Sequence, residues 1–404
     1  VPQSSNDLRL MAIGRSPCEY SAILSGSTLP CPARRDIGVG GIQENSLGDT
    51  MRGTGHILVG LVCLIALSAA NCADGEDWFR YRGPKLDGKS TEVNWSHQWG
   101  ENGPTIVWTE DVGAGISGVV CADGRLYTMG NRNDVDSVFC FDLATGTQRW
   151  RHDYASPTDP NEFDGGPTST PTIDGDRVFT LSRTGDLFAL VAATGDVAWH
   201  VNLPAETGIR IPAWGYAASP LVHQSRVFLN VGDAGVAVER SSGKVIWASQ
   251  DKDCGYASPV PCRYQGRNGV IFGSARSYVC VDMESGEEHW RQRWLTTFGC
   301  NAADAIVTGD RVFLSSAYNR GSSLIRPSAK QIETIWKHKD YQNQISTSVL
   351  VEQHLYGATG DVDAGTSLAC VELSTGDVCW RDDNVQAAAL MAAGERLIVL
   401  TVEG

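Results

Sequence analysis

Along most of the chain, short stretches in which apolar and polar residues alternate are separated by Gly, Asp or Asn. The stretches Thr170–Ile173 and Arg177–Leu181 flank the turn Asp174–Asp176, and Ala305–Val307 and Arg311–Ser315 flank a similar turn. Alternation with a period of two, interrupted by turn-forming residues, is typical of antiparallel strands joined by hairpins. We find no stretch with helical periodicity, so the pattern predicts an all-β protein.

The strands belong to a repeat that ends in tryptophan. Five copies close with Ser/Thr-Gly, three further residues and Trp, and each reads as a hairpin whose turn needs a left-handed glycine. A sixth copy, ending at Trp336, keeps the spacing but lacks the glycine. The five phrases are Cys140–Trp150, Ala189–Trp199, Ala237–Trp247, Cys280–Trp290 and Cys370–Trp380. The repeat tryptophans, 42 to 49 residues apart, are Trp108, Trp150, Trp199, Trp247, Trp290, Trp336 and Trp380.

Each repeat holds four short strands in about 45 residues, which is typical of a β-propeller blade. Six such units run from Trp108 to about Val371, and Ala387–Met391 with Arg396–Leu400 begin a seventh. We interpret the repeat tryptophans as packing residues that fill the space between neighbouring sheets, not as a cofactor cage, because one indole ring buries a large apolar area.

The repeated phrase resembles the repeat of pyrroloquinoline quinone (PQQ)-type propellers. That family includes quinoprotein alcohol dehydrogenases and the non-catalytic outer-membrane assembly lipoprotein BamB. Asp77–Pro84 also resembles the segment that precedes the propeller in secreted bacterial relatives, so the resemblance covers about residues 77–404. The family typically has eight blades. The resemblance therefore implies a propeller that is incomplete at the C-terminus, with an open seam where strands are missing.

The N-terminal part has the order of a secretory signal peptide. Met51–His56 is polar and basic, Ile57–Ala66 is apolar, and Ser68–Ala70 supplies the small residues of a cleavage site. Cys72 offers a lipid anchor as the less favoured alternative. We therefore expect a secreted or periplasmic protein. The predicted segments are 1–50, an upstream extension that is disordered or not native; 51–70, the signal peptide; 71–104, a lead-in; and 105–404, the propeller.

Charge narrows the range of partners. The formal net charge is −14, and residues 1–70 carry five Lys/Arg and five Asp/Glu, so the imbalance lies on residues 71–404. An acidic body disfavours binding to nucleic acid or to an anionic membrane surface. The apolar run Ile57–Ala66 is too short for a permanent transmembrane span. The remaining candidate ligands are proteins, peptides and glycans.

The cysteines and histidines do not form a recognisable metal motif. Cys140, Cys280 and Cys370 occupy a repeat position where other copies carry Ala, so they read as small apolar residues. Disulfides are conceivable between Cys254 and Cys262 and between Cys370 and Cys379. Without CxxC or HExxH we predict no metal site. Four histidines close to blade tryptophans read as solvated edge residues: His152, His200, His289 and His338.

Enzyme chemistry has weaker support than binding. Quinoprotein dehydrogenases of the resembling family hold their cofactor with adjacent cysteines, a calcium ligand set and a catalytic aspartate, and this sequence has no adjacent cysteine pair. Gly113–Gly118 matches GxGxxG, but a strand and not a helix should follow it. We predict a non-catalytic binding propeller with no catalytic residue and no cofactor. The alternative is a PQQ- and calcium-dependent alcohol or sugar dehydrogenase, or a degenerate relative.

A binding face can be placed by topology. Loops from an outer strand to the next inner strand share one face with the loops that join the middle strands. The longest are Asp153–Gly166 and Pro204–Gly215, and long loops on a rigid frame often carry function. The residues predicted on this face are Arg183, Arg210, Trp214, Tyr216, Asp233, Tyr256, Arg276, Asn301, Tyr318, Asn319, Arg320 and Asp361.

Overall fold

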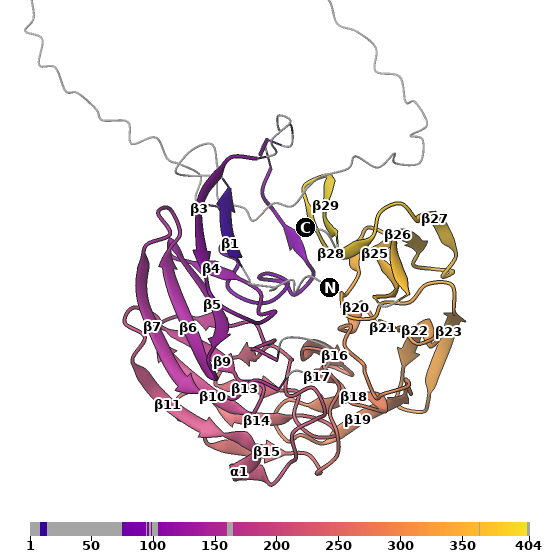
Figure 1. Ribbon diagram of the computed structural model, residues 1–404. Coiled ribbons are helices and arrows are strands. Elements are labelled where there is room, and N and C mark those ends of the chain that lie inside the picture. Colours follow the sequence, from indigo (N-terminus) through magenta and orange to yellow (C-terminus); the bar gives the residue numbers. More distant parts are fainter. Residues whose placement is uncertain are drawn as a thin grey trace, which may run out of the picture. The chain divides into compact units, whose positions relative to one another are not determined.

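The computed structural model describes residues 9–13, 75–93, 95–96, 98, 104–159, 165–362 and 364–401. The predicted signal peptide 51–70, the proposed anchor Cys72 and most of segment 1–50 lie outside these residues. The described strands belong to one compact unit, which includes Gly75–Gly404. Within this unit the sheets follow one another around a common centre (Figure 1).

The strands form six four-stranded antiparallel sheets, here called blades 1 to 6. They are blade 1 (β4 Val120–Ala122, β5 Arg125–Arg132, β6 Val135–Asp142, β7 Gln148–Ala155), blade 2 (β8 Thr172–Asp174, β9 Arg177–Leu181, β10 Asp186–Val191, β11 Val197–Asn202), blade 3 (β12 Leu221–His223, β13 Arg226–Leu229, β14 Val236–Glu239, β15 Val245–Ala248), blade 4 (β16 Val260–Tyr264, β17 Arg267–Gly273, β18 Ser277–Asp282, β19 Glu288–Arg293), blade 5 (β20 Ile306–Thr308, β21 Arg311–Ser316, β22 Gly321–Pro327, β23 Ile332–His338) and blade 6 (β24 Val349–Val351, β25 His354–Asp361, β26 Gly365–Glu372, β27 Val378–Asp382).

Two smaller sheets complete the described strands. A three-stranded sheet joins β2 (Lys89–Ser90) in parallel to β28 (Ala387–Ala393), which pairs with β29 (Arg396–Thr401). The other pairs β1 (Arg9–Ile13) with β3 (Ile106–Asp111).

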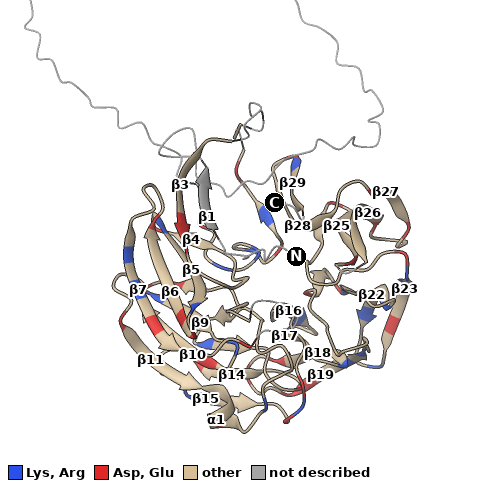
Figure 2. Ribbon diagram, in the orientation of Figure 1, with Lys and Arg blue, Asp and Glu red and all other residues tan. Residues whose placement is uncertain are grey.

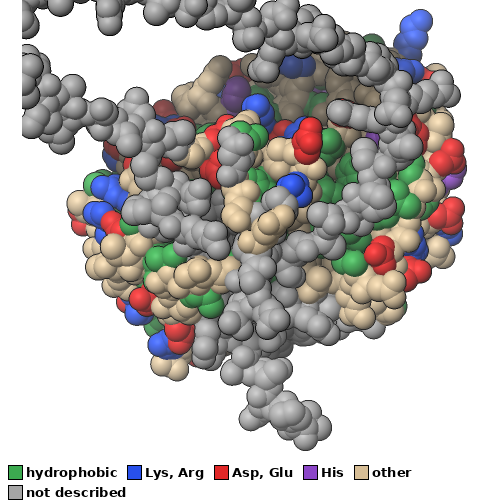
Figure 3. All heavy atoms as spheres, turned by 90° about the horizontal axis from the view of Figure 1, so that it is seen from above, with side chains coloured by type: hydrophobic (Ala, Val, Ile, Leu, Met, Phe, Trp, Pro, Cys, Tyr) green, Lys and Arg blue, Asp and Glu red, His purple; other side chains and the backbone are tan. Residues whose placement is uncertain are grey.

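In Figure 3, hydrophobic side chains gather in the right half of the view, bordered by scattered charged side chains. The predicted all-β propeller, with six full blades and a partial seventh, is confirmed.

Burial follows the position of a strand within its blade. The middle strands are covered on both faces, as in β18, where every residue is buried, whereas the outer strand β7 is exposed at alternate positions. Strands covered on both faces read as continuous apolar runs. Most Lys/Arg and Asp/Glu accordingly lie on outer strands, in turns or at the ends of middle strands. In Figure 2 the two charge types are spread around the described part of the unit.

Each blade is locked to the next by a tryptophan and a glycine. Trp150 is 8% exposed, and its indole N–H donates to the carbonyl of Ala192 in blade 2 at 2.9 Å. Its ring lies over Gly195, where an added Cβ would meet the ring at 2.7 Å, and Gly195 has a φ of +79°. The glycine of the repeat is thus required twice, for its left-handed turn and for the close approach of the ring. The same pairing recurs as Trp108–Gly146, Trp199–Gly243, Trp247–Gly286 and Trp336–Gly376.

The repeat copy in blade 5 lacks the glycine, and the tryptophan of the preceding blade packs differently there. Blade 5 has no Gly in its last turn, and Trp290 of blade 4 packs instead in a cluster with Ile325 and Ile332 of blade 5. Trp290 is still only 6% exposed. The Trp290 ring is therefore still packed between blades 4 and 5 although the glycine is missing.

A chain of five hydrogen bonds, here called the inter-blade relay, runs around the centre. Two residues before the first strand of each blade, a backbone N–H donates to a side-chain oxygen at the same position of the next blade. The links are Gly118 to Thr170 (3.1 Å), Thr170 to Ser219 (3.0 Å), Ser219 to Ser258 (3.1 Å), Ser258 to Asp304 (2.8 Å) and Asp304 to Thr347 (2.7 Å). The relay satisfies amides that leave the sheets at this point.

Residues 75–93, here called the lead-in segment, contact several blades. Cys121 of blade 1 donates its N–H to the Trp78 carbonyl. Arg82 donates to the carbonyls of Thr347 at 2.9 Å and Ser348 at 2.8 Å, just before blade 6. Lys89 donates to the carbonyl of Leu350 at 3.1 Å. The segment therefore ties together blades that are distant in sequence.

Some local expectations were wrong. A short helix, α1 (Leu203–Thr207), stands where only strands and turns were expected; the Asn202 side chain caps its start and Gly208 ends it with a φ of +71°. Cys254 and Cys262 do not pair, because the Cys262 thiol lies 3.4 Å from Cys280 instead. His289 is not a solvated edge residue: its side chain is 10% exposed and stacks near Tyr264.

Candidate binding face

The loops that follow the outer strands and those that join the middle strands lie at the same end of the blades. We call this end the binding face. It is formed by residues 203–220, 249–259, 294–305 and 339–348, together with the turns between the second and third strands. The predicted ligand-contacting residues come from these loops. The structure divides them into exposed, ion-paired and buried groups.

Four aromatic side chains form a continuous row on this face, here called the aromatic row. The Trp214 ring meets the Tyr256 ring edge-on, with centroids 5.7 Å apart, and meets the Phe298 ring at 6.3 Å. Phe298 in turn meets Tyr318 at 5.6 Å, also edge-on. Edge-to-face contacts between such rings are favourable. The row links loops of blades 3, 4 and 5.

Local backbone geometry fixes the row. The N–H of Gly215 donates to the Pro212 carbonyl, closing the turn that carries Trp214. Tyr318 and Asn319 both have a φ of +59°, which is the geometry of a two-residue hairpin turn between β21 and β22. The amide of Gln344 donates to the Tyr318 hydroxyl at 3.1 Å. The rings are thus held in place before any ligand arrives.

Phe298 is the residue that the sequence analysis missed. It is 67% exposed, the highest exposed fraction among the large hydrophobic residues of the described chain. It lies in an irregular loop after β19, outside the repeated phrase, and no pattern marks it. Its loop position before the next blade was the available signal. Further exposed apolar side chains on the loops of this face are Ile211, Leu295, Ile345 and Val362.

The charged residues of the face are engaged with one another. Arg210 donates to Asp253 at 2.8 Å. Asp233 lies 3.0 Å from Arg291 and 3.5 Å from Lys252. The Arg210–Asp253 pair is exposed on both sides, and such exposed pairs contribute little to stability, so it can exchange partners with a bound polypeptide. The Asp233–Arg291 pair is less exposed. Arg276 is exposed beside them.

Three predicted contact residues are buried and serve the fold. Tyr216 is 1% exposed and donates its hydroxyl to the Arg210 carbonyl. Asn301 is fully buried, with its amide donating to the carbonyls of Ser274 and Trp294. Arg183 is 6% exposed and donates to Asp159 at 2.9 Å. These residues were predicted to meet a ligand, but small flanking residues let the loops close over them.

The remaining predicted residues lie at the edge of the row. The Arg320 guanidinium sits 3.9 Å from the centre of the Trp294 ring, a cation–π contact. Burial lowers the pKa of Arg320. Asn319 is exposed, and its N–H donates to the Gln342 side chain. Asp361 closes β25 opposite Gly365.

Among the described residues of the face, a buried thiol and two phenols have raised pKa values. Burial raises the pKa of the Cys300 thiol, which also contacts the Tyr318 hydroxyl. Burial likewise raises the pKa of Tyr256. A thiol and phenols held in their protonated forms are poor nucleophiles.

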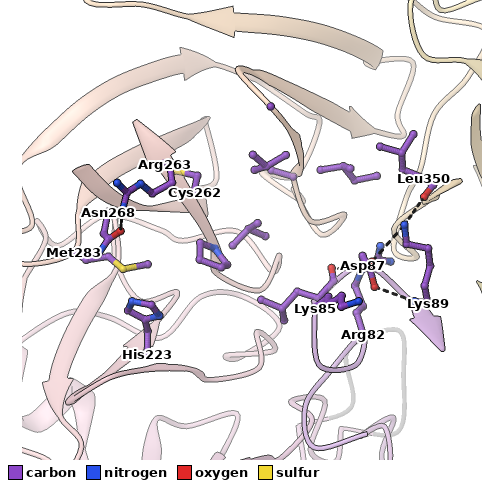
Figure 4. Close-up of a pocket in the computed structure, with 17 residues that line it drawn as sticks. Arg82, Lys85, Asp87, Lys89, His223, Cys262, Arg263, Asn268, Met283 and Leu350 are labelled. Atoms are coloured by element: carbon purple, nitrogen blue, oxygen red, sulfur yellow. Dashed lines mark hydrogen bonds and ion pairs between the residues drawn. The ribbon is translucent and has the colours of Figure 1, made fainter. Parts of the chain in front are cut away.

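A cavity of about 560 Å³ lies elsewhere, between the lead-in segment and blades 3 to 6. Figure 4 shows Arg82, Lys85 and Lys89 on one side of it and Arg263 with Asn268 on the other. Arg82 and Lys89 are already bonded to backbone carbonyls, as is Arg263 to Gly266. These cations thus hold the chain in place around the cavity.

The residues present do not match the PQQ and calcium set that the resemblance implies for a dehydrogenase. The chain has no adjacent cysteine pair. Asp304, the buried carboxylate at the centre, accepts the Ser258 N–H at 2.8 Å and lies 4.0 Å from Arg82. The hydroxyls around it belong to the inter-blade relay. We therefore derive no dehydrogenase step.

Comparison with known proteins agrees with this architecture. A curated relative, outer membrane protein assembly factor BamB of Yersinia pestis, is 24% identical over 304 residues, covering 70% of each chain. The crystal structure of BamB from Moraxella catarrhalis has a TM-score of 0.53 at 18% identity, covering 74% of this chain and 84% of that one. A europium-containing methanol dehydrogenase has a TM-score of 0.54 at 13% identity, covering 72% and 74%. These structural likenesses show the fold.

The family assignment rests on the match to a family model. The family model described as outer membrane protein assembly factor BamB matches residues 135–382, more than half of the chain. This match spans the repeat from blade 1 to blade 6 and confirms the resemblance found in the sequence. Among the described residues, helices are too short for a membrane crossing. The chain therefore belongs to the BamB-like family of PQQ-repeat β-propellers.

Proposed function

We propose that this chain is a non-catalytic binding propeller of the cell envelope, which docks a polypeptide segment through its binding face. The observation that carries the proposal is the aromatic row, in which Trp214, Phe298 and their two tyrosine neighbours lie edge to face across three blades. Aromatic residues are enriched at protein interfaces and dominate binding energy there.

The row has the features of a preformed docking surface. Its rings are fixed by turn geometry, so little conformational entropy is lost when a partner binds. Exposed aliphatic side chains border it, and ion pairs such as Arg210–Asp253 offer polar contacts at the rim. An apolar centre with a polar rim is the usual anatomy of an interface. An extended segment with spaced apolar side chains fits this surface best.

The relatives suggest where the partner is found. The curated relative is named as an outer membrane protein assembly factor. The solved structure from Moraxella catarrhalis carries the same name, BamB. We accordingly propose a polypeptide of outer-membrane assembly as the ligand. Export through the signal peptide at residues 51–70 would bring the chain to the cell envelope, where outer-membrane polypeptides are assembled.

The test measures peptide binding to the full chain. A peptide array tiled over outer-membrane β-barrel sequences should retain the protein at segments with spaced aromatic residues. Phe298→Ala and Trp214→Ala should each weaken binding of the best peptide at least about tenfold, because truncating a hot-spot aromatic costs about 2 kcal/mol or more and about 1.4 kcal/mol corresponds to a factor of ten. Val197→Ala, an exposed apolar change on outer strand β11, is the matched control and should leave binding unchanged.

Two outcomes would contradict the proposal. Equal binding by wild type and by the Phe298→Ala, Trp214→Ala double variant would remove the aromatic row from the interface. Retention of PQQ and calcium through dialysis, with dye-linked alcohol oxidation, would favour the dehydrogenase alternative. A parallel glycan array tests whether sugars, which also stack on aromatic rings, are bound in place of peptides.

A further inference from the structure

Three potential metal ligands converge on blade 6, away from the binding face. They are the imidazole of His354, the carboxylate of Glu372 and the thiol of Cys379, whose ligand atoms all lie within 4.8 Å of one another. His354 Nε2 lies 3.2 Å from a Glu372 oxygen. Of the residues that the structure describes, this is the group of His, Cys, Asp and Glu compact enough to surround an ion.

The sheet itself brings these side chains together. His354 of β25 and Glu372 of β26 are directly opposite in the antiparallel ladder, so they share one face. Between β26 and β27 the register shifts: Cys370 pairs with Trp380, but Val371 pairs with Val378. Cys379 is therefore the extra residue of a bulge. A bulge re-aims a side chain, and here it does so beside the other two ligands.

The repeat provides an internal comparison. His354 is the first residue of the second strand of its blade. The corresponding residues of blades 1 to 5 are Arg125, Arg177, Arg226, Arg267 and Arg311. Arg226, for example, reaches the Met283 carbonyl of the following blade at 2.7 Å. His354 departs from this rule and pairs with Glu372 of its own sheet instead.

We propose that His354, Glu372 and Cys379 bind a divalent transition-metal ion, with zinc preferred, and leave the fourth position to water. One nitrogen, one carboxylate oxygen and one thiolate form a donor set that suits zinc. Metal–ligand bonds of about 2.0–2.3 Å separate the donors of a tetrahedral site by about 3.3–3.8 Å, so these side chains need only small rotations. On binding, the Cys379 thiol gives up its proton to solvent and its sulfur coordinates the ion.

A disulfide between Cys370 and Cys379 would compete with metal binding. The Cys370 thiol contacts that of Cys379, but it lies deeper, at 2% exposed, and outside the group of three. Oxidation of the two thiols by a small disulfide would join their sulfurs and release two equivalents of small thiol. That reaction would consume the sulfur ligand. The inference therefore holds for the protein with free thiols.

The test is a cobalt titration of the full chain, freed of metal by a chelator and kept reduced by a phosphine. One Co²⁺ should bind per chain, with a thiolate-to-cobalt charge-transfer band that Zn²⁺ abolishes by displacement. His354→Arg restores the residue of the other blades and should fold, yet lower the affinity at least about tenfold. Cys379→Ser should remove the charge-transfer band. Thermal melting checks that both variants are folded.

His200→Ala is the matched control. His200 also faces a carboxylate, that of Asp186 at 3.0 Å, but in blade 2 and outside any group of three ligands. It should leave the titration unchanged. An unchanged band and affinity in folded His354→Arg and Cys379→Ser would overturn the inference. So would a Cys370–Cys379 disulfide that mass spectrometry still finds after the phosphine treatment, because no thiolate would then be available.

Discussion

The backbone N–H of Ser258 donates to a carboxylate oxygen of Asp304 at 2.8 Å, at a point where neighbouring links of the inter-blade relay use hydroxyl oxygens. Asp304 is 6% exposed, and Arg82 of the lead-in segment lies 4.0 Å away. A carboxylate can accept from Ser258 and attract the guanidinium at once. The relay and the lead-in segment therefore meet at one side chain.

Asp304 should make stability depend on pH. Burial raises its pKa from 3.8 to about 6. Because the folded pKa lies above the unfolded value, the folded protein keeps the proton at pH values where the unfolded chain has lost it. The contribution of Asp304 to the free energy of unfolding should thus fall as pH rises from about 4 to 6, by up to about 3 kcal/mol, and then level.

Asp304→Thr isolates this contribution, since Thr170 and Thr347 serve the same relay position. Urea unfolding at several pH values between 4.5 and 7 should show a flatter dependence in the variant. Aspartates with lowered pKa, such as Asp142 and Asp186, act in the opposite direction but mainly below pH 4. Identical slopes for variant and wild type would mean that Asp304 has an ordinary pKa.

Gly195→Ala should be costly for two reasons. A left-handed alanine costs about 1–2 kcal/mol, and its Cβ would press on the Trp150 ring, adding about 1–3 kcal/mol of overpacking. Gly309→Ala is the control: its φ is +62°, but an added Cβ meets open space. Urea unfolding should give a clearly larger loss for Gly195→Ala. Equal losses would show that the ring contact has no energetic weight.

Trp150→Ala should lower the free energy of unfolding by about 3–5 kcal/mol, as for other buried large-to-small changes. Trp199 is only partly buried where it packs against blade 3, and its indole N–H donates to the Arg240 carbonyl, so Trp199→Ala should destabilise the protein by less than Trp150→Ala. Trp380 is more exposed than Trp150, so Trp380→Ala should cost less. Chemical denaturation of the three variants gives the ranking, and an unchanged midpoint for Trp150→Ala would contradict the packing role.

Arg82→Ala should destabilise the protein by at least about 2 kcal/mol, because two hydrogen bonds from a charged donor are lost and two buried carbonyls are left without it. Lys85→Ala provides the comparison, since Lys85 is exposed on the same segment. It should change the melting temperature little. Limited proteolysis should cut the lead-in segment faster in Arg82→Ala alone. Equal resistance in both variants would argue against the lead-in as a structural tie.

The repeat could be recognised in the sequence because the packing between blades requires the same residue types at about the same place in each blade. Tryptophans and glycines equivalent to Trp150 and Gly195 recur in most repeats because these blades meet their successors in the same way. The relay leaves a weaker trace, in Ser219 and Ser258 just before prolines. Both features follow from contacts that are repeated along the chain.

Three residues of the aromatic row, Trp214, Tyr256 and Tyr318, were placed on the binding face from the sequence. The other features were missed because they depend on exceptions to the repeat. Phe298 lies in a loop whose course is set by tertiary contacts, and its exposed ring has no counterpart in the phrase. Tyr216 and Asn301 share a loop face with it yet point inward, a difference that sequence position does not encode. The ligands His354 and Cys379 come from separate strands, so no short spacing motif announces them.

The tryptophan–glycine locks all point the same way along the chain, from each blade to its successor. A blade is consequently secured only after the following one has been synthesised and folded against it. Because synthesis runs from the N-terminus, the newest blade would carry an uncovered indole ring until the next blade forms, and packing would be completed progressively toward the C-terminus. With this order of folding, the most recently formed blade would at every stage be the part of the chain that is most accessible to a chaperone or a protease.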